Sequence, residues 1–201
     1  MALRDHIRSF LEGSSQDPAD MEELLLFGRV PYIEKLDNSL AQFPNLRKLS
    51  LSTNSIAQVS NLQGLGKLEI LSLGRNQIKN LNGLDPVADS LRELWISYNN
   101  IERLSGIEKL KNLQILYMNH NKLASWPEFE RLRELPNLEE LSLIGNPLQV
   151  DAGGGEPFGR DPGWRQEVIR RLPNLKKLDG FPITPHEREA IHGPGVGSSS
   201  S

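Results

Sequence analysis

The chain has 201 residues, a formal net charge of −3 at neutral pH, 24% charged residues and no cysteine. Without cysteine it has no disulfides and no cysteine-ligated zinc, which argues against a secreted, disulfide-stabilised domain. The small net charge and the lack of any apolar run of membrane-spanning length argue against nucleic-acid and membrane partners. We therefore expect a soluble, cytoplasmic protein.

Residues 1–31 are expected to form an N-terminal helical cap. The first apolar residues have helical spacing, and Gly13 can end that helix; they are Leu3, Ile7, Phe10 and Leu11. Asp17-Pro18 has the pattern of a helix start, so we expect a second helix through Met21–Phe27.

Residues 32–149 contain a repeated pattern, LxxLxLxxNxI, preceded by a degenerate first strand at Tyr32–Leu36. The asparagine of the pattern recurs at intervals of 22, 23, 22 and 25 residues, at Asn54, Asn76, Asn99, Asn121 and Asn146. This period and consensus predict leucine-rich repeats. The asparagine amides are expected to form a ladder that pairs buried backbone groups in the turns.

Within each repeat, leucines alternate with outward residues as in a β-strand, and later apolar residues recur every three positions, as in a short helical return. No single repeat can bury its own leucines, so the repeats must stack. We therefore predict an α/β leucine-rich repeat solenoid with a curved parallel β-sheet on the concave face, short helical returns and helical caps.

Residues 150–192 are expected to hold an insert loop, a capping helix and a terminal half-repeat. The loop is Val150–Gly163, with glycines at its centre, and the helix begins at Asp161-Pro162 with Trp164, Val168 and Leu172 on one face. The half-repeat is Leu175–Phe181, and Thr184 with Glu187 has the spacing of a capping box. Residues 193–201 form a Gly/Ser tail that we expect to be disordered.

The sequence contains no recognisable catalytic motif. A phosphate-binding loop, G-x-S-x-G, H-E-x-x-H and C-x-x-C are all absent, and the four histidines are scattered. We expect no enzymatic activity, no cofactor and no metal.

The outward strand positions carry an aromatic cluster. Trp95 and Tyr117 occupy equivalent positions in consecutive repeats, so they should lie side by side on neighbouring strands. The candidate partner-binding residues of this concave face are Ile70, Arg75, Trp95, Tyr98, Ile115, Tyr117, Asn119, His120 and Ile144. An exposed aromatic cluster with a polar rim is typical of a protein-binding surface. The alternative is that loops or the chain's own ends cover it.

A second candidate surface is basic and lies near the C-terminal cap. It comprises Arg165, Arg170, Arg171, Lys176 and Lys177. One interpretation is contact with an acidic partner surface, and the other is an ordinary solvated helix face.

Three strings resemble the axonemal dynein light chain 1 family in their outward residues as well as in the repeat consensus. They are Leu49-Ser-Leu-Ser-Thr-Asn54, Leu71-Ser-Leu-Gly-Arg-Asn-Gln-Ile-Lys-Asn-Leu-Asn-Gly-Leu84 and Glu93-Leu-Trp-Ile-Ser-Tyr-Asn99. The resemblance extends from about Tyr32 to Gly180. The glycine-rich Val150–Gly163 segment and a tail without acidic residues depart from the family.

The resemblance implies a non-catalytic light chain of ciliary outer arm dynein, located in the axoneme. It implies binding of a dynein heavy chain in the motor region, at the microtubule-binding domain of the stalk, through the apolar β-face. It also implies a possible contact between the basic cluster and tubulin. By itself the chain is expected to be monomeric. The alternatives are a generic intracellular repeat adaptor, such as a phosphatase-regulatory or splicing-associated protein, and an enzyme.

Overall fold

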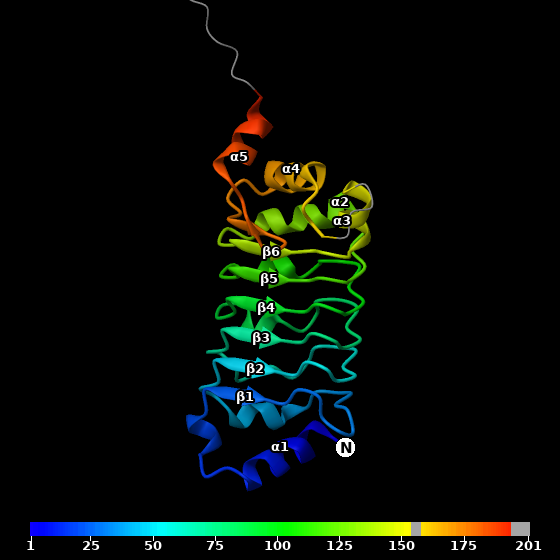
Figure 1. Ribbon diagram of the computed structural model, residues 1–201. Helices are drawn as coiled ribbons and strands as arrows, with labels where there is room; N and C mark the ends of the chain where they lie inside the picture. Colours follow the sequence, from blue (N-terminus) through cyan, green and yellow to red (C-terminus); the bar gives the residue numbers. More distant parts are fainter. Residues whose placement is uncertain (154–157, 194–201) are drawn as a thin grey trace, which may run out of the picture.

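The computed structural model describes residues 1–153 and 158–193. In this part of the chain a single sheet runs in the order β1 to β8, parallel throughout except for the antiparallel last pair, β7 and β8. The strands stack along the length of the molecule, with helices at both ends (Figure 1). Their bounds are β1 Glu23–Leu25, β2 Lys48–Ser50, β3 Ile70–Ser72, β4 Glu93–Trp95, β5 Ile115–Tyr117, β6 Glu140–Ser142, β7 Lys177–Leu178 and β8 Phe181–Pro182.

This architecture confirms the predicted leucine-rich repeat solenoid. The central leucine of each repeat strand is completely buried, and the following leucine, isoleucine or methionine two positions on is buried with it. Short helical returns cover the other side of this core: η2 Asn38–Gln42, η3 Asp85–Val87, η4 Ile107–Lys109, α2 Trp126–Phe129 and η5 Glu130–Glu134. Because each turn of the solenoid buries the leucines of its neighbours, the core is one continuous column.

The predicted asparagine ladder is present. All five asparagines are buried, and Asn99 shows the pattern: its Oδ1 accepts from the Ile78 amide at 2.9 Å, while its Nδ2 donates to the Leu73 and Ile96 carbonyls at 2.9 and 3.1 Å. Each amide thus pairs backbone groups of its own repeat and of the repeat before it. The ladder connects successive turns at a depth that water does not reach.

A second set of asparagines, which the repeat consensus does not contain, lies at the other end of the strands. The Nδ2 of Asn45, Asn112 and Asn137 each donates to a carbonyl of the preceding repeat, at 2.6, 2.7 and 2.8 Å. The two sets together tie consecutive repeats at both ends of their strands.

At the N-terminus the structure confirms one prediction and corrects two. Helix α1 spans Leu3–Glu12 and ends at Gly13, and Asp17 caps a single turn, η1 Pro18–Asp20. The expected helix through Met21–Phe27 is wrong, because this segment forms β1; the expected strand at Tyr32–Leu36 is not a strand. Leu24 and Leu26 are fully buried while Leu25 is exposed, which is strand periodicity, and pairing with β2 selects it. The first strand therefore lies within residues 1–31.

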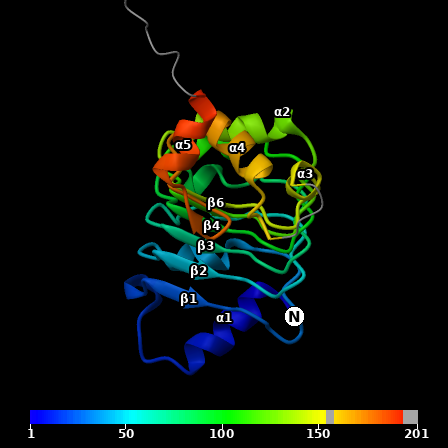
Figure 2. The same cartoon turned by 45° about the horizontal axis from the view of Figure 1, so that its top comes forward.

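The C-terminal cap consists of α3 Pro147–Ala152, α4 Pro162–Arg171 and α5 Pro185–His192, which gather at one end of the solenoid (Figure 2). Trp164, Val168 and Leu172 are buried as predicted, and Thr184 and Glu187 form the predicted capping box. Helix α3 occupies the first part of the expected insert loop, as far as Ala152. The centre of that loop, residues 154–157, and residues 194–201 of the expected tail lie outside the described residues.

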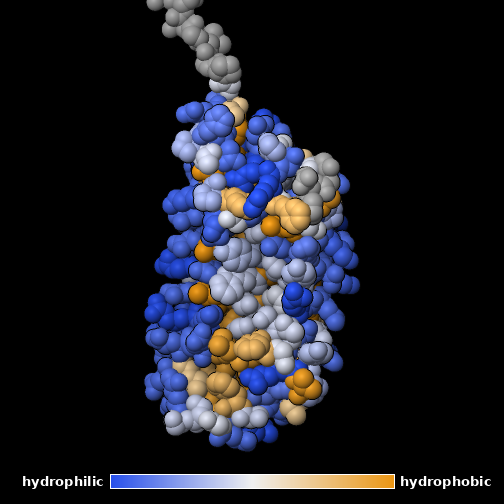
Figure 3. Space-filling model, viewed as in Figure 1, coloured by the Kyte–Doolittle hydropathy of each residue, from blue (hydrophilic) through white to orange (hydrophobic). Residues whose placement is uncertain are grey.

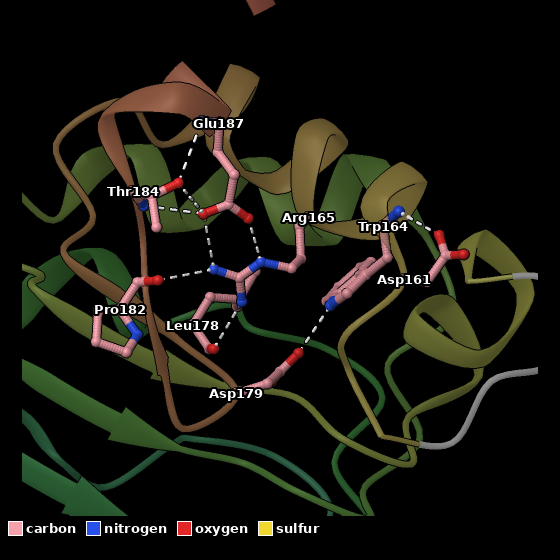
Figure 4. A network of polar contacts seen from close by, with 8 residues as sticks. All are labelled: Asp161, Trp164, Arg165, Leu178, Asp179, Pro182, Thr184 and Glu187. Carbon is pink, nitrogen blue, oxygen red and sulfur yellow. Dashed lines mark hydrogen bonds and ion pairs between the residues drawn. The ribbon is translucent and has the colours of Figure 1, made fainter. Parts of the chain in front are cut away.

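Buried polar side chains hold this cap on the last repeat (Figure 4). Asp179 replaces the ladder asparagine: Oδ1 accepts from the Leu143 amide at 2.7 Å and Oδ2 from Trp164 Nε1 at 2.7 Å. Burial raises the pKa of the Asp179 carboxyl. Arg165 forms an ion pair with Glu187 at 2.5 Å and donates to the Leu178 and Pro182 carbonyls. These contacts lower the pKa of Glu187, chiefly through its hydrogen bond from Arg165.

None of the helices in the described part of the chain is both long and apolar enough to span a bilayer.

Candidate partner-binding site on the concave face

Trp95 and Tyr117 are adjacent on the concave face, as the repeat spacing predicts. They are register partners on β4 and β5, their ring centroids are 6.2 Å apart and their planes are tilted by 36°. Both side chains are half-buried. Neighbouring strands place serines in the same row, so the two rings stand above small side chains on either side. Two large rings beside such small neighbours form a raised aromatic surface that a partner can contact.

The polar tips of both rings already have partners. Trp95 Nε1 donates to Glu93 at 3.0 Å, and the Tyr117 hydroxyl donates to Glu140 at 2.9 Å. Burial, then the hydrogen bond to Glu140 and the nearby carboxylates, raise the pKa of Tyr117 to about 12. Tyr117 therefore stays neutral at physiological pH. A partner that covers these rings gains apolar contact without having to satisfy the indole or the phenol.

Arg75, Tyr98 and His120 form a second cluster, in the turns that follow the strands. Each has a left-handed backbone, with φ of 54°, 58° and 53°, because the chain turns sharply just before the ladder asparagine. The Arg75 guanidinium lies 4.2 Å from the Tyr98 ring centroid, and Tyr98 stacks on His120 with centroids 4.5 Å apart and planes 20° apart. The next turn has Gly145, where a Cβ would lie 2.4 Å from His120 Nδ1. Glycine there leaves room for the stack.

The remaining predicted residues of this face differ in their burial and in their hydrogen bonds. Ile70 and Ile115 are half-buried and flank Glu93 in the sheet register. Asn119 is on the face, but its Oδ1 accepts from the Ser142 hydroxyl at 2.6 Å and from the Ile144 amide at 2.9 Å. Asn119 therefore serves at least in part to join adjacent repeats.

Sequence reasoning missed the N-terminal part of this face. Leu25 stands in the same row as Trp95, at the start of the sheet, and is 37% exposed; Phe27, two residues further, is 62% exposed. Val30 and Tyr32 are also exposed. Pale and orange residues continue up the middle of the molecule between blue margins (Figure 3). The available signal was Leu24-x-Leu26, which repeats Leu49-x-Leu51 but is not followed by the asparagine.

The basic residues near the C-terminus do not form one open patch. Arg165 is only 6% exposed and is fully engaged inside the cap, so its expected role in contacting a partner is wrong. Arg171 stacks on Trp126, 3.9 Å from the ring centroid, and its ion pairs are with Glu130 and Glu167.

The other three basic side chains are more accessible. Arg170, Lys176 and Lys177 are 55%, 68% and 42% exposed, and each is paired with a glutamate. Exposed ion pairs of this kind are weak, so these three side chains stay accessible to an acidic partner.

No group of three or more His, Cys, Asp or Glu side chains within residues 1–153 and 158–193 is placed to hold a metal ion.

Comparisons with solved structures agree with the fold. An internalin from Listeria monocytogenes aligns with a TM-score of 0.65 at 19% identity, over 88% of this chain and 54% of that one. The Drosophila melanogaster SNF/U2A' complex aligns with a TM-score of 0.53 at 24% identity, over 85% of this chain and 79% of that one. At these identities the similarity shows the solenoid fold alone.

Comparisons with sequences are more specific. The family model for leucine-rich repeats in two copies matches residues 44–86 and 89–131. Dynein axonemal light chain 1 of Rattus norvegicus is 53% identical over 187 residues, which are 93% of this chain and 95% of that protein. The proteins of the same name from Homo sapiens and Chlamydomonas reinhardtii are 52% and 50% identical over 93% of this chain, covering 95% and 93% of their own lengths. This chain belongs to the axonemal dynein light chain 1 family.

Proposed function

We propose that this protein is a non-catalytic light chain of axonemal outer arm dynein that binds the motor region of a heavy chain through its concave face. The bound element is the microtubule-binding domain of the stalk, and binding there modulates the contact between motor and microtubule. The observation that carries the proposal is the adjacent Trp95–Tyr117 pair, whose polar tips are already satisfied. Such rigid, half-buried rings are the side chains that most often anchor protein interfaces.

Family membership supports the same proposal from another direction. The relatives carry the name of an axonemal dynein light chain, which supports a role for this chain in the axoneme of a cilium or flagellum. A solenoid built on leucines and structural asparagines, with an aromatic surface, suits binding rather than chemistry. A generic repeat adaptor, the alternative that the repeats alone suggest, would share the repeat consensus but not this high sequence identity to axonemal dynein light chains.

Truncation of the aromatic pair tests the proposal. Trp95→Ala removes a side chain that points away from the core, so the melting temperature should change little. Affinity for a recombinant heavy-chain stalk fragment, measured by titration calorimetry, should fall by about 2 kcal/mol or more, or about thirtyfold. Tyr117→Ala should act similarly, and the double variant should be non-additive because the rings are in contact.

A control from the same repeat is Arg103→Ala, which truncates an exposed side chain of the return segment that follows β4, away from the concave face. It should leave binding unchanged. Normal binding by Trp95→Ala would show that the concave pair is not the interface. A large loss of thermal stability in that variant would instead show that Trp95 belongs to the core.

The tubulin contact, as a further part of the proposal, rests on Arg170, Lys176 and Lys177 alone. Arg170→Glu with Lys176→Glu should weaken co-sedimentation with microtubules and leave heavy-chain binding intact. The wild-type contribution should fade with salt, because exposed charges are screened over about 10 Å at 0.1 M. Co-sedimentation that is indifferent to both changes removes these residues from the mechanism.

A further inference from the structure

Two charged side chains of the concave surface, Glu93 and Arg75, form no ion pair in the described part of the chain. Lys48 Nζ lies 5.6 Å from the centroid of the Trp95 ring, but its ion pair is with Glu23. Other charges in the first row of strand positions are compensated: Lys48 pairs with Glu23, and Lys177 pairs with Glu140, both at 3.4 Å. Glu93 accepts a hydrogen bond from Trp95 Nε1, and no cation within residues 1–153 and 158–193 forms an ion pair with it.

Arg75 is held in place by stacking rather than by an ion pair. Its guanidinium lies over the Tyr98 ring, which is supported in turn by His120. Stacking uses the flat face of the guanidinium and leaves its N–H groups, which point outward in the plane, without a protein acceptor in the described residues. A guanidinium fixed in this way loses little entropy on binding a carboxylate in bidentate geometry.

The two charges lie on opposite sides of the aromatic pair. Along the strand direction, Glu93 begins β4 and Trp95 ends it, and Tyr98 with its stacked Arg75 follows in the turn. Glu93 is half-buried and Arg75 is exposed. The concave face therefore has a polarity: an acidic edge, an aromatic centre and a cationic edge.

From this polarity we infer the chemistry of the partner segment. It presents apolar side chains over Trp95 and Tyr117, a lysine or arginine to Glu93, and an aspartate or glutamate to Arg75. The inference rests on the proposed heavy-chain binding and specifies the surface that is bound. A partner that covered the rings without these charges would take Glu93 out of water with one hydrogen bond, from the indole N–H, and no ion pair among the described residues, which is unfavourable. The opposed charges also permit one orientation of the partner and disfavour the reverse.

Charge reversals at the two edges test the inference on the intact chain. Arg75→Glu and Glu93→Lys are titrated against a recombinant fragment of an axonemal dynein heavy chain that contains the stalk microtubule-binding domain. Each should lower affinity by about tenfold or more at low ionic strength, mainly by slowing association, and the deficit should shrink as salt rises. Matched controls are Lys79→Glu and Glu102→Lys, exposed residues of the return segments, which should bind as wild type.

Milder variants separate a charge effect from a loss of folding. Glu93→Gln retains an acceptor for Trp95, and Arg75→Gln retains a planar group on Tyr98. Both should melt as wild type and bind more weakly, though by less than the reversals. Unchanged or tighter binding by all four variants, while Trp95→Ala still weakens binding, would overturn the inferred polarity and leave the proposed site intact. Unchanged binding by Trp95→Ala as well would overturn both.

Discussion

Replacing Asn99 by alanine should destabilise the solenoid, because it removes hydrogen bonds to buried backbone groups of two successive repeats. Asn99 is 6% exposed and satisfies the Ile78 amide and the Leu73 and Ile96 carbonyls. Alanine leaves the buried Ile78 amide without an acceptor, which costs about 1–3 kcal/mol. The Leu73 and Ile96 carbonyls each lose one bond but still accept from Asn76 and Asn121. The free energy of unfolding should therefore fall by about 1–3 kcal/mol, a measurable part of the roughly 5–15 kcal/mol that is typical of a domain.

Equilibrium urea unfolding followed by circular dichroism measures this loss. The matched control is the next residue: the Asn100 side chain makes no hydrogen bond to the residues that the structure describes, so Asn100→Ala should shift stability by less than about 0.5 kcal/mol. Equal midpoints for the two variants would refute the ladder argument, since the two substitutions remove the same atoms and differ only in burial and hydrogen bonding.

Asn99→Asp separates hydrogen bonding from side-chain volume. One carboxylate oxygen can still accept from Ile78, but the other replaces an N–H donor and faces the Leu73 and Ile96 carbonyls. Repulsion and burial should raise the pKa of the new carboxyl above its ordinary value of about 3.9. Stability relative to wild type should then be highest below that value and decline as pH rises through the elevated pKa. A deficit that does not vary with pH would contradict this.

Three further predictions concern the core and the C-terminal cap. Leu94→Ala should lower the free energy of unfolding by about 2–5 kcal/mol, since Leu94 is completely buried; a wild-type melting temperature would contradict its place in the core. Asp179→Asn should lower the free energy of unfolding by about 1–2 kcal/mol, because one amide oxygen cannot accept from both the Leu143 amide and the Trp164 indole. A gain in stability would show that removing a buried charge outweighs the lost hydrogen bond. Glu187→Gln should lower the stability of the cap by about 1–3 kcal/mol at neutral pH. Because the pKa of Glu187 is lowered in the folded protein, the difference in melting temperature between variant and wild type should shrink as pH falls below about 4.5. A difference that persists at low pH would contradict the ion pair.

The sequence by itself determined the repeat architecture and the place of the aromatic pair. A strand has a side-chain period of two, and repeats of nearly constant length stack in register, so equivalent positions must become neighbours. This reasoning correctly places Trp95 beside Tyr117 and the ladder asparagines in the buried turns. It worked because each conclusion depends on local periodicity that every repeat restates.

Only the tertiary structure decided the features that depend on what a segment meets in space. Met21–Phe27 has apolar residues compatible with a helix, but the open edge of β2 pairs with it as a strand, which adds Leu25 and Phe27 to the concave surface. Arg165 looks like any surface arginine in the sequence, yet it lies inside the cap because Glu187 and two carbonyls converge on it from a later segment. Charge compensation is likewise non-local: whether Lys48 or Glu93 has a partner depends on which side chains adjacent repeats place beside it.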